Sequence, residues 1–531
     1  MITAPPMVDA RLDPRLAHGQ SSWSNRVLLL SLAGIFFLTF YPFRFEHQDS
    51  GGFLSPFALN GWGKGVDALD AFLNILLFVP FGFGLAEKLR ERGQSKLRTF
   101  IAVYIFGALV SYFVEFLQLY IPGRDSGWLD VVTNSSGALV GACFFEAAGA
   151  AIIAWFVALE RKLDSWLTLP KIGVLVLLYI GFWCVVVGPL QKQVKLTTWT
   201  SDSFLAVGHS ASLSPGPAWR GRIFELDIWN RAVPASLAQR LTSADSAHSQ
   251  FPGSLIAYRF SGQAPFEDNQ HFLPSLDWAS RSTSSASATG GGTALDGHSW
   301  LISTGSVPTL VSSIESSGQF ALRLVCEPAE IKGVDARIVS LASPSKAVNL
   351  ELKQYDSALA FWFRNKLSMQ RSRMTWVVPH VFAGNQPRNV LLSFNGSAVS
   401  LYIDGRKSRH SYDFGPGLAL AHYIRNVKSA ELAGYGYILY AMIFFPAGCL
   451  LGFAWRRLDV RLLWRLIFLA AGFFLPAFAI EWVLMDAAGR SCSLQHIGLS
   501  AALAFAGSLW MNADRSFSVA LRHESETAVA R

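Results

Sequence analysis

The stretch EFLQLYIPGRDSGWLDVVTNSSGALVG, residues 115–141, lies between two runs that are apolar enough to cross a bilayer. It nevertheless carries five strongly polar side chains: Glu115, Gln118, Arg124, Asp130 and Asn134. A charged side chain in hydrocarbon costs several kcal/mol on the lower estimates, so such residues are rare in membrane segments and usually serve a purpose. The stretch therefore predicts membrane helices that carry either a polar site or a polar link between helices.

The composition of the whole chain agrees with a membrane protein. Of its 531 residues, 51% are hydrophobic and only 15% are charged. A helix needs about 20 mainly apolar residues to cross a bilayer. Eight runs of about this length begin near residues 26, 70, 99, 128, 172, 435, 462 and 497.

The basic residues between these runs predict the orientation of the chain. Lys and Arg are enriched in cytoplasmic loops, and they cluster before the first run and after the second, fourth and sixth runs. The alternate short loops hold only Arg44, Lys64, Arg124 and Arg490. Both termini are therefore predicted to be cytoplasmic, and the polar stretch 191–433 to be outside. The net charge of +8 reflects these loops, and no nucleic-acid partner is predicted.

The polar stretch is predicted to be all-β. In NVLLSFNGSAVSLYIDGRK (389–407), the Asn395-Gly396 pair separates two strand-like runs, which is a strong hairpin signal. Segments 221–231, 318–328, 336–343 and 349–365 show similar length and alternation. Several short strands at this spacing favour a sandwich of jelly-roll type.

The membrane part contains an internal repeat. EFLQLYIPGRDSGWLDVVTNSSGALVG aligns without a gap with EWVLMDAAGRSCSLQHIGLSAALAFAG (481–507), which sets Glu115 on Glu481 and Arg124 on Arg490. The same offset sets Pro80 on Pro446. One register over three helices predicts two four-helix halves in the same orientation, with the β-domain inserted into the second.

The second half has lost part of the polar set. Asn74 becomes Tyr440, Gln118 becomes Leu484, Asp130 becomes His496 and Asn134 becomes Ser500. The first half is therefore the better candidate for a functional site.

The first half resembles the VanZ-like membrane family. The resemblance rests on NILLFVPFGFGL (74–85), on the stretch 115–141, and on TFYPFRF (39–45) at the end of the first helix. It covers about residues 25–160 well and 434–512 weakly. The family is named for a teicoplanin-resistance protein of bacterial envelopes, so the resemblance implies a multi-pass protein of the bacterial cytoplasmic (inner) membrane.

The inserted region resembles concanavalin A-like, laminin G-type jelly rolls. WRGRIFELDIWNRAVPASLAQRL (219–241) is similar to the closing strand and tail of that family, although here it comes first. This order suggests a circularly permuted sandwich, which is feasible because domain termini usually lie close together. The calcium-binding acids of such modules have no placed equivalents, so no cofactor is predicted and calcium in the sandwich is left open.

Four tryptophans of the insert are candidates for a sugar-stacking platform, although aromatic residues at strand positions usually belong to a core and at least two of the four are expected there. They are Trp199, Trp219, Trp229 and Trp362.

The polar membrane residues allow two interpretations. At helical spacing Glu115 and Gln118 share one face, as do Asp130 and Asn134. With Arg124, and with Asn74 on the second helix, they could form an external pocket for a polar or phosphate headgroup, in which a carboxylate is a general base or binds a cation.

Alternatively, the Glu115 and Arg124 side chains form an ion pair between adjacent helices, while Asn and Gln side chains hydrogen-bond across the bundle. Retention of Glu481 and Arg490 favours the structural role for that pair. The residues lost in the second half favour a functional role. Asp67 and Asp70 are interpreted as solvated acids at a helix start.

The sequence thus predicts about eight transmembrane helices in two VanZ-like halves plus a β-sandwich. The predicted parts are an N-terminal cytoplasmic tail (1–24), a VanZ-like four-helix domain (25–160), a fifth transmembrane helix (172–190), an extracytoplasmic sandwich (196–425), three helices of a degenerate repeat (434–512) and a C-terminal cytoplasmic tail (513–531).

The function predicted from these parts is a bacterial cell-envelope membrane protein with an external carbohydrate- or protein-binding module. It would serve envelope or exopolysaccharide processing or glycopeptide tolerance, with the lipid bilayer and a glycan or envelope protein as partners. The alternative is an intramembrane enzyme or transporter for lipid-linked envelope intermediates. A third option is a sensor or assembly scaffold without a small ligand. Whether the chain is an enzyme is left open.

Overall fold

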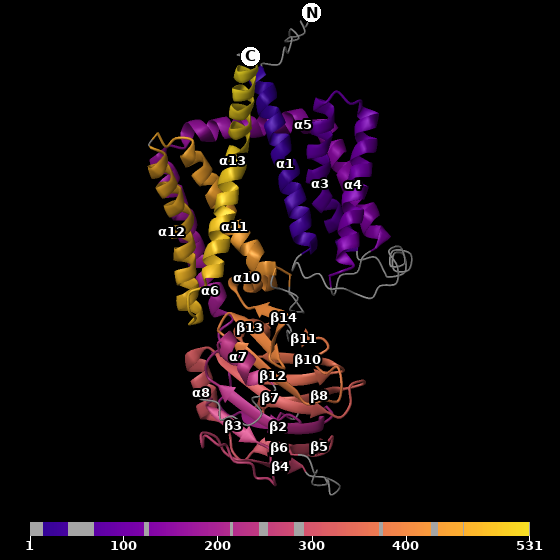
Figure 1. Cartoon of the computed structure of the whole chain (residues 1–531), viewed down its shortest axis with the longest axis vertical. Coiled ribbons are helices and arrows are strands. Elements are labelled where there is room, and N and C mark those ends of the chain that lie inside the picture. The colour runs from indigo at the N-terminus through magenta and orange to yellow at the C-terminus, as the bar shows by residue number, and fades with distance from the viewer. Residues whose placement is uncertain are drawn as a thin grey trace, which may run out of the picture. The chain divides into compact units, whose positions relative to one another are not determined.

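The computed structural model of the chain forms two compact units, and each is described by itself (Figure 1). The first unit comprises residues 1–174, 449–460 and 508–531, and the second comprises residues 175–448 and 461–507. The structure describes residues 14–40, 68–121, 127–212, 216–243, 253–280, 291–370, 375–425, 434–459 and 461–529.

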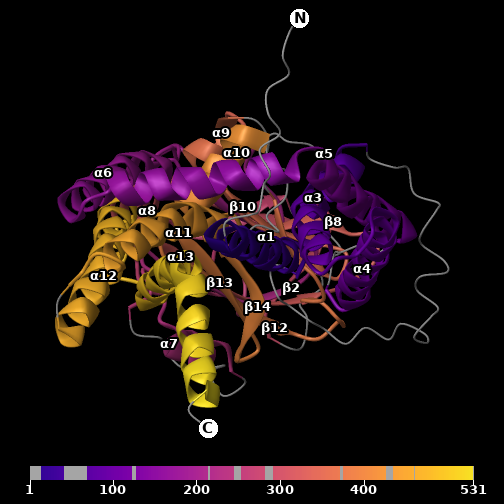
Figure 2. The same ribbon diagram turned by 90° about the horizontal axis from the view of Figure 1, so that it is seen from above.

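The first unit is helical, and its helices group together in both views of the ribbon (Figure 1, Figure 2). Its main helices are α1 (Pro14–Phe40), α3 (Ala68–Glu91), α4 (Lys96–Gln118) and α5 (Trp128–Trp166). The polar turn before α4 supplies its N-cap, because the Ser95 hydroxyl accepts the backbone N–H of Arg98 at 3.4 Å.

Small residues set the closeness of α3 and α5. A Cβ atom on Gly82 of α3 would overlap the carbonyl oxygen of Ala138 in α5. Gly137 and Gly141, the ends of the GALVG motif, likewise face the carbonyl oxygens of Ile75 and Val79. This is the small-residue packing by which membrane helices bring their backbones together.

Seven helices in the described part of the chain are long and apolar enough to span a membrane. They are Ala71–Glu91, Lys96–Gln118, Trp128–Trp166, Leu169–Lys192, Tyr435–Trp455, Leu462–Ala488 and Leu494–Asn512. Seven of the eight predicted spans are thereby confirmed. The first predicted span falls on Asn25–Phe40, whose described apolar part is shorter than the others.

The second unit combines further helices with the β region. The apolar helices are α6 (Leu169–Lys192), α11 (Gly434–Trp455), α12 (Leu462–Ala488) and α13 (Leu494–Val529), of which α6, α11 and α13 extend into the first unit. The helices of the β region are α7 (Ala235–Thr242), α8 (Pro308–Ser317), α9 (Lys366–Gln370) and α10 (Pro416–Arg425).

The β region consists of two antiparallel sheets. Sheet A has the order β11-β10-β9-β8-β1-β6-β4, and sheet B has the order β14-β13-β12-β7-β2-β3, with β5 paired to β2. The strands of sheet A are β1 (Phe204–Val207), β4 (Leu276–Ser280), β6 (Trp300–Ser303), β8 (Asp335–Ala342), β9 (Val348–Tyr355), β10 (Ala358–Phe363) and β11 (Trp376–Val378). Those of sheet B are β2 (Arg220–Trp229), β3 (Ile256–Arg259), β5 (Thr293–Asp296), β7 (Phe320–Pro328), β12 (Arg388–Phe394), β13 (Ala398–Ile403) and β14 (Arg406–Asp413).

One hydrophobic core joins the two sheets. It contains Leu352 and Phe361 of sheet A together with Leu324 and Leu392 of sheet B, all nearly inaccessible to solvent. Side chains that interdigitate between two sheets are the defining feature of a β-sandwich. The two-sheet part of the prediction is therefore confirmed, whereas the helices α7–α10 show that the insert is not all-β.

The hairpin predicted at Asn395-Gly396 is confirmed. It joins β12 to β13, with Phe394 paired to Val399. Gly396 has a φ of +89°, which few residues other than glycine adopt. The Asn395 side-chain oxygen accepts the backbone N–H of Ala398 at 2.7 Å, which closes the turn.

The same hairpin lies against the C-terminal end of α12. A Cβ atom on Gly396 would be 2.6 Å from the carbonyl oxygen of Ala488. The Gln319 side chain, next to the end of α8, donates to the carbonyl oxygen of Gly489 at 2.9 Å. The β region is thus in direct contact with α12 inside this unit.

Candidate functional site

The first polar cluster lies where α3, α4 and α5 approach one another. The glycine packing places α5 against α3, and a Cβ atom on Gly107 of α4 would lie 2.9 Å from the Cβ of Ala138. Asn74 comes from α3, Glu115 and Gln118 from α4, and Asp130 and Asn134 from α5. We call these five residues the first-half cluster.

Hydrogen bonds connect the amide and carboxylate members of this cluster. The Asn74 Nδ2 group donates to Asp130 Oδ1 at 2.7 Å. The Asn134 Nδ2 group donates to Ser111 Oγ at 2.9 Å, and this hydroxyl lies 3.5 Å from the carbonyl oxygen of Asp130. The structure therefore joins three predicted residues through Ser111, which the sequence reasoning missed.

The two residues of the first-half cluster on α4, Glu115 and Gln118, hold neighbouring segments in place. Glu115 is 3% exposed, and its carboxylate accepts the backbone N–H of Gly127 at 3.1 Å. Gln118 donates to the carbonyl oxygen of Thr39 in α1 at 3.2 Å. Glu115 therefore secures the start of α5, and Gln118 links α4 to α1.

The position of Asp130 suits a carboxylate. Gly127 is the N-cap of α5, so Asp130 lies in the first turn of the helix, where the helix dipole favours negative charge.

Arg124 and Asp67 lie outside the described residues, as does the side chain of Asp70. The predicted Glu115–Arg124 ion pair therefore stays a prediction.

A second cluster forms at Glu481, at the end of α12. The Arg490 guanidinium makes two hydrogen bonds to the Glu481 carboxylate, at 2.5 and 3.0 Å. The backbone N–H of Ser493 donates to Glu481 Oε1 at 2.7 Å, and His496 Nδ1 lies 3.3 Å from Oε2. We call Glu481, Arg490 and His496 the second-half cluster.

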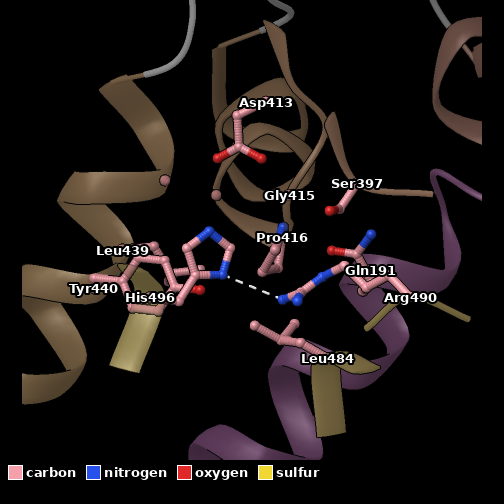
Figure 3. A pocket seen from close by; sticks show the side chains of 12 residues that line it. Gln191, Ser397, Asp413, Gly415, Pro416, Leu439, Tyr440, Leu484, Arg490 and His496 are labelled. Carbon is pink, nitrogen blue, oxygen red and sulfur yellow. Dashed lines mark hydrogen bonds between the residues drawn. The ribbon is translucent and has the colours of Figure 1, made fainter. Parts of the chain in front are cut away.

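A small hollow adjoins the second-half cluster (Figure 3). Its free volume is about 10 Å³, close to the space that one water molecule needs. Asp413 from the end of β14 points into it from one side, opposite His496 and Arg490 (Figure 3). Gln191 at the end of α6 also lines it.

Burial raises the pKa of Asp413 above its ordinary value. The charges of His496 and Arg490 and the N–H of Gly415 act in the opposite direction, but burial is the largest of these effects.

Among the described residues, no group of three or more His, Cys, Asp or Glu side chains is arranged to hold a metal ion.

The sequence of the first-half helices is similar to a known family. Residues 27–151 match the VanZ/LLP1 family. The match contains the whole first-half cluster and less than a quarter of the chain. Neither the curated proteins nor the solved structures contain a match to this chain. The chain thus carries a VanZ-like membrane region and an additional β region.

Contacts within the VanZ-like region recur 366 residues later. The N–H of Gly127 bonds to Glu115, and that of Ser493 bonds to Glu481. Asn74 contacts Asp130, and the rings of Tyr440 and His496 at the matching positions lie 5.3 Å apart.

The glycine packing recurs at the same offset. Gly82 abuts the carbonyl oxygen of Ala138, and Gly448 abuts that of Ala504. The offset that aligns the two sequences therefore also relates side-chain and backbone contacts.

Some of these partners carried a signal in the sequence and others did not. Ser111 lies four residues before Glu115 on the same helix, so the spacing rule that paired Asp130 with Asn134 would have found it. Asp413 lies in a strand of the inserted region, and its approach to Arg490 depends on how that region folds onto α12. Periodicity in the sequence carries no such information.

Proposed function

We propose that the chain is a cell-envelope membrane protein in which a VanZ-like region is combined with an external carbohydrate- or protein-binding β-sandwich. The proposed role is in envelope or exopolysaccharide processing or in glycopeptide tolerance. The observation that carries the proposal is a polar first-half cluster inside the VanZ-like region, together with an additional region of two antiparallel sheets.

The proposal includes an internal repeat and a fold for the insert. The recurring Glu115 and Glu481 contacts support a second, degenerate VanZ-like copy over residues 434–512. We also propose that the sandwich is concanavalin A-like and circularly permuted. The placement of β2, an early strand, in the interior of sheet B between β7 and β3 supports this order.

The orientation is part of the proposal and has its own test. With both termini in the cytoplasm, the turn at Lys346 between β8 and β9 is external, and the turn at Arg92 between α3 and α4 is internal. Both residues are exposed. The five native cysteines are first replaced by serine, because Cys143 and Cys492 are exposed. In this background a membrane-impermeant maleimide should label Lys346→Cys in intact cells and should label Arg92→Cys only after lysis. The reverse pattern would contradict the orientation.

Binding of glycans is tested with the full chain in lipid nanodiscs. We expect the protein to retain envelope polysaccharides on a glycan array, whereas empty nanodiscs should not. An array without any retained glycan would remove the carbohydrate function, and a screen against envelope proteins would then decide whether the β region binds a protein.

A second function is favoured by one feature of the first-half cluster. Asn134 is 3% exposed, and its Oδ1 atom has no hydrogen-bond partner among the described residues. A buried acceptor without a partner costs free energy, and it could be satisfied by a polar group of a lipid-linked intermediate. This supports the alternative of an intramembrane enzyme or transporter for such intermediates.

The alternative is tested by Asp130→Asn and Asn134→Ala, with Ser136→Ala as the control. Ser136 lies on the same helix, and its hydroxyl donates to the carbonyl oxygen of Val132, one turn earlier. If the cluster is functional, the first two variants lose glycopeptide tolerance at normal protein levels and the control keeps it. Loss in proportion to the amount of folded protein would mean that the cluster is structural.

A further inference from the structure

The outer face of sheet A differs from its inner face. Leu350 and Leu352 of β9 belong to the core, so Glu351 and Lys353 lie on the opposite face of the strand. The register pairs Glu351 with Ser340 on one side and with Trp362 on the other. These residues therefore form one row across the outer face.

Small, buried side chains flank this row. Ser340 is paired with Ala206, and Lys353 is paired with Ala360. Larger side chains surround a hollow of about 190 Å³ at this position. The hollow is lined by Arg337, Glu351, Lys353, Phe361, Trp362 and Thr375.

All four candidate tryptophans are buried. Trp199, Trp219 and Trp362 belong to the main core, and Trp229 is 1% exposed in a second apolar cluster. Trp362, at 7% exposure, is the member of the four that also lines the hollow, and it does so next to charged side chains. An aromatic ring beside hydrogen-bonding groups is suited to a ligand with both apolar and polar surfaces.

The charged side chains of the hollow include an ion pair between Arg337 and Glu351. Arg337 Nε lies 3.0 Å from Glu351 Oε1, and both side chains are largely buried, at 13% and 5% exposure. Lys353 pairs at 2.5 Å with Asp335, which is 58% exposed and does not line the hollow. Because an exposed ion pair contributes little stability, Lys353 can exchange this partner for a ligand at small cost.

We propose that this hollow binds one acidic sugar residue, a hexuronate, of a polysaccharide. Glu351 accepts hydrogen bonds from ring hydroxyls, Arg337 and Lys353 donate to hydroxyls and to the ligand carboxylate, and Trp362 contacts the apolar edge of the ring. The lining carries two positive charges and one negative charge, which favours an anionic over a neutral ring. The inference rests on the proposed carbohydrate-binding function and specifies its ligand.

The test uses the full chain in phosphatidylcholine nanodiscs and three probes. These are an oligogalacturonate, free glucuronate and a neutral maltooligosaccharide, with binding followed by calorimetry. We expect both acidic probes to bind and the neutral one to bind at least about tenfold more weakly, because it lacks the carboxylate that accepts a charge-assisted hydrogen bond. Binding of the oligomer without the monosaccharide would locate recognition in the chain and overturn the single-residue site.

The decisive variant is Arg337→Gln, and Arg388→Gln is its matched control. Arg388 forms an ion pair with Asp404 in sheet B, at 2.7 Å and away from the hollow. Arg337→Gln should weaken uronate binding by about tenfold or more, whereas Arg388→Gln should leave it unchanged. Lys353→Gln should give a smaller loss, and thermal unfolding of each variant checks that the sandwich is folded.

The outcomes separate this inference from the broader function. Equal uronate binding by wild type and a folded Arg337→Gln would overturn the site. If neutral glycans alone bind, the inference fails and the carbohydrate function stands. If no glycan binds, both fail.

Discussion

The two polar clusters share a backbone framework and differ in the chemistry of their side chains. In the first-half cluster, Asn74 and Asp130 form a neutral-to-charged hydrogen bond, and Glu115 accepts a backbone N–H. In the second-half cluster, Glu481 forms a buried ion pair with Arg490. The comparison teaches that Glu115 and Glu481 have the same structural role, since each secures the start of the following helix. The other residues of the two clusters are free to diverge.

The second-half cluster also has a neighbour from outside the membrane helices. Asp413 of β14 and Gln191 of α6 line the hollow beside Arg490 (Figure 3). Gln191 donates to the carbonyl oxygen of Gly396 at 3.2 Å. We therefore interpret the second-half cluster as the contact site that holds the β region in place.

The largest effect is expected from Arg490→Met. It leaves the Glu481 carboxylate, which is 3% exposed, without its main partner. Loss of one member of a buried ion pair costs about 3–5 kcal/mol in the free energy of unfolding. The matched change Arg388→Met breaks a more exposed pair and should cost about 1 kcal/mol or less. Denaturant unfolding of both variants measures the difference, and equal losses would contradict the buried role.

The next effect tests the repeat directly. Gly82→Ala and Gly448→Ala each place a methyl group against a backbone carbonyl, so each should destabilise the protein by about 1–3 kcal/mol. Gly34→Ala and Gly181→Ala are controls, because a Cβ atom there meets nothing within 4 Å. The controls should be neutral or stabilising by up to about 1 kcal/mol. A loss of stability at only one of Gly82 and Gly448 would contradict the structural equivalence of the two halves.

A smaller effect is expected for the side chains that differ between the halves. A double-mutant cycle of Asn74→Ala and Asp130→Ala should show a coupling of about 0.6–1.7 kcal/mol, the range of hydrogen bonds between membrane helices. The corresponding cycle of Tyr440→Ala and His496→Ala should give about 0.5–1.5 kcal/mol from the ring contact. Coupling near zero in either cycle would show that the observed contact adds no stability.

The smallest effect concerns the pH dependence of Asp413→Asn. Because the folded-state pKa of Asp413 is raised, the folded protein holds this proton more tightly than the unfolded chain. Burial of this carboxyl group therefore costs no free energy of unfolding below the unfolded-state pKa of about 3.9. As the pH rises through the raised folded-state pKa, the buried charge lowers the free energy of unfolding more and more. The variant should unfold at a higher temperature than wild type at pH 7, and this gain should shrink towards pH 4. A gain that grows on acidification would contradict the burial argument.

Local signals in the sequence predicted much of this molecule. Hydrophobic runs located seven described spans, and the Asn395-Gly396 pair located a hairpin, because both depend on neighbouring residues. The alignment set Glu115 on Glu481, and each of these carboxylates accepts the backbone N–H of a residue just before the following helix.

Contacts between distant segments could not be predicted in the same way. That Asp413 faces Arg490, or that Trp362 lines the hollow of sheet A as well as the core, depends on strand register and on how the sheets pack. A one-residue change in register moves every side chain to the other face. The sequence indicated alternation but did not identify which set of residues faces the core.

The turn at Gly396 has a consequence for the length of the chain at this point. Most β-hairpins accept inserted residues at the tip, because the tip extends into solvent. Here the tip abuts the carbonyl oxygen of Ala488, so every added residue must push the sandwich away from α12. An insertion after Gly396 would therefore act as a spacer that separates the β region from α12 while leaving each of them folded.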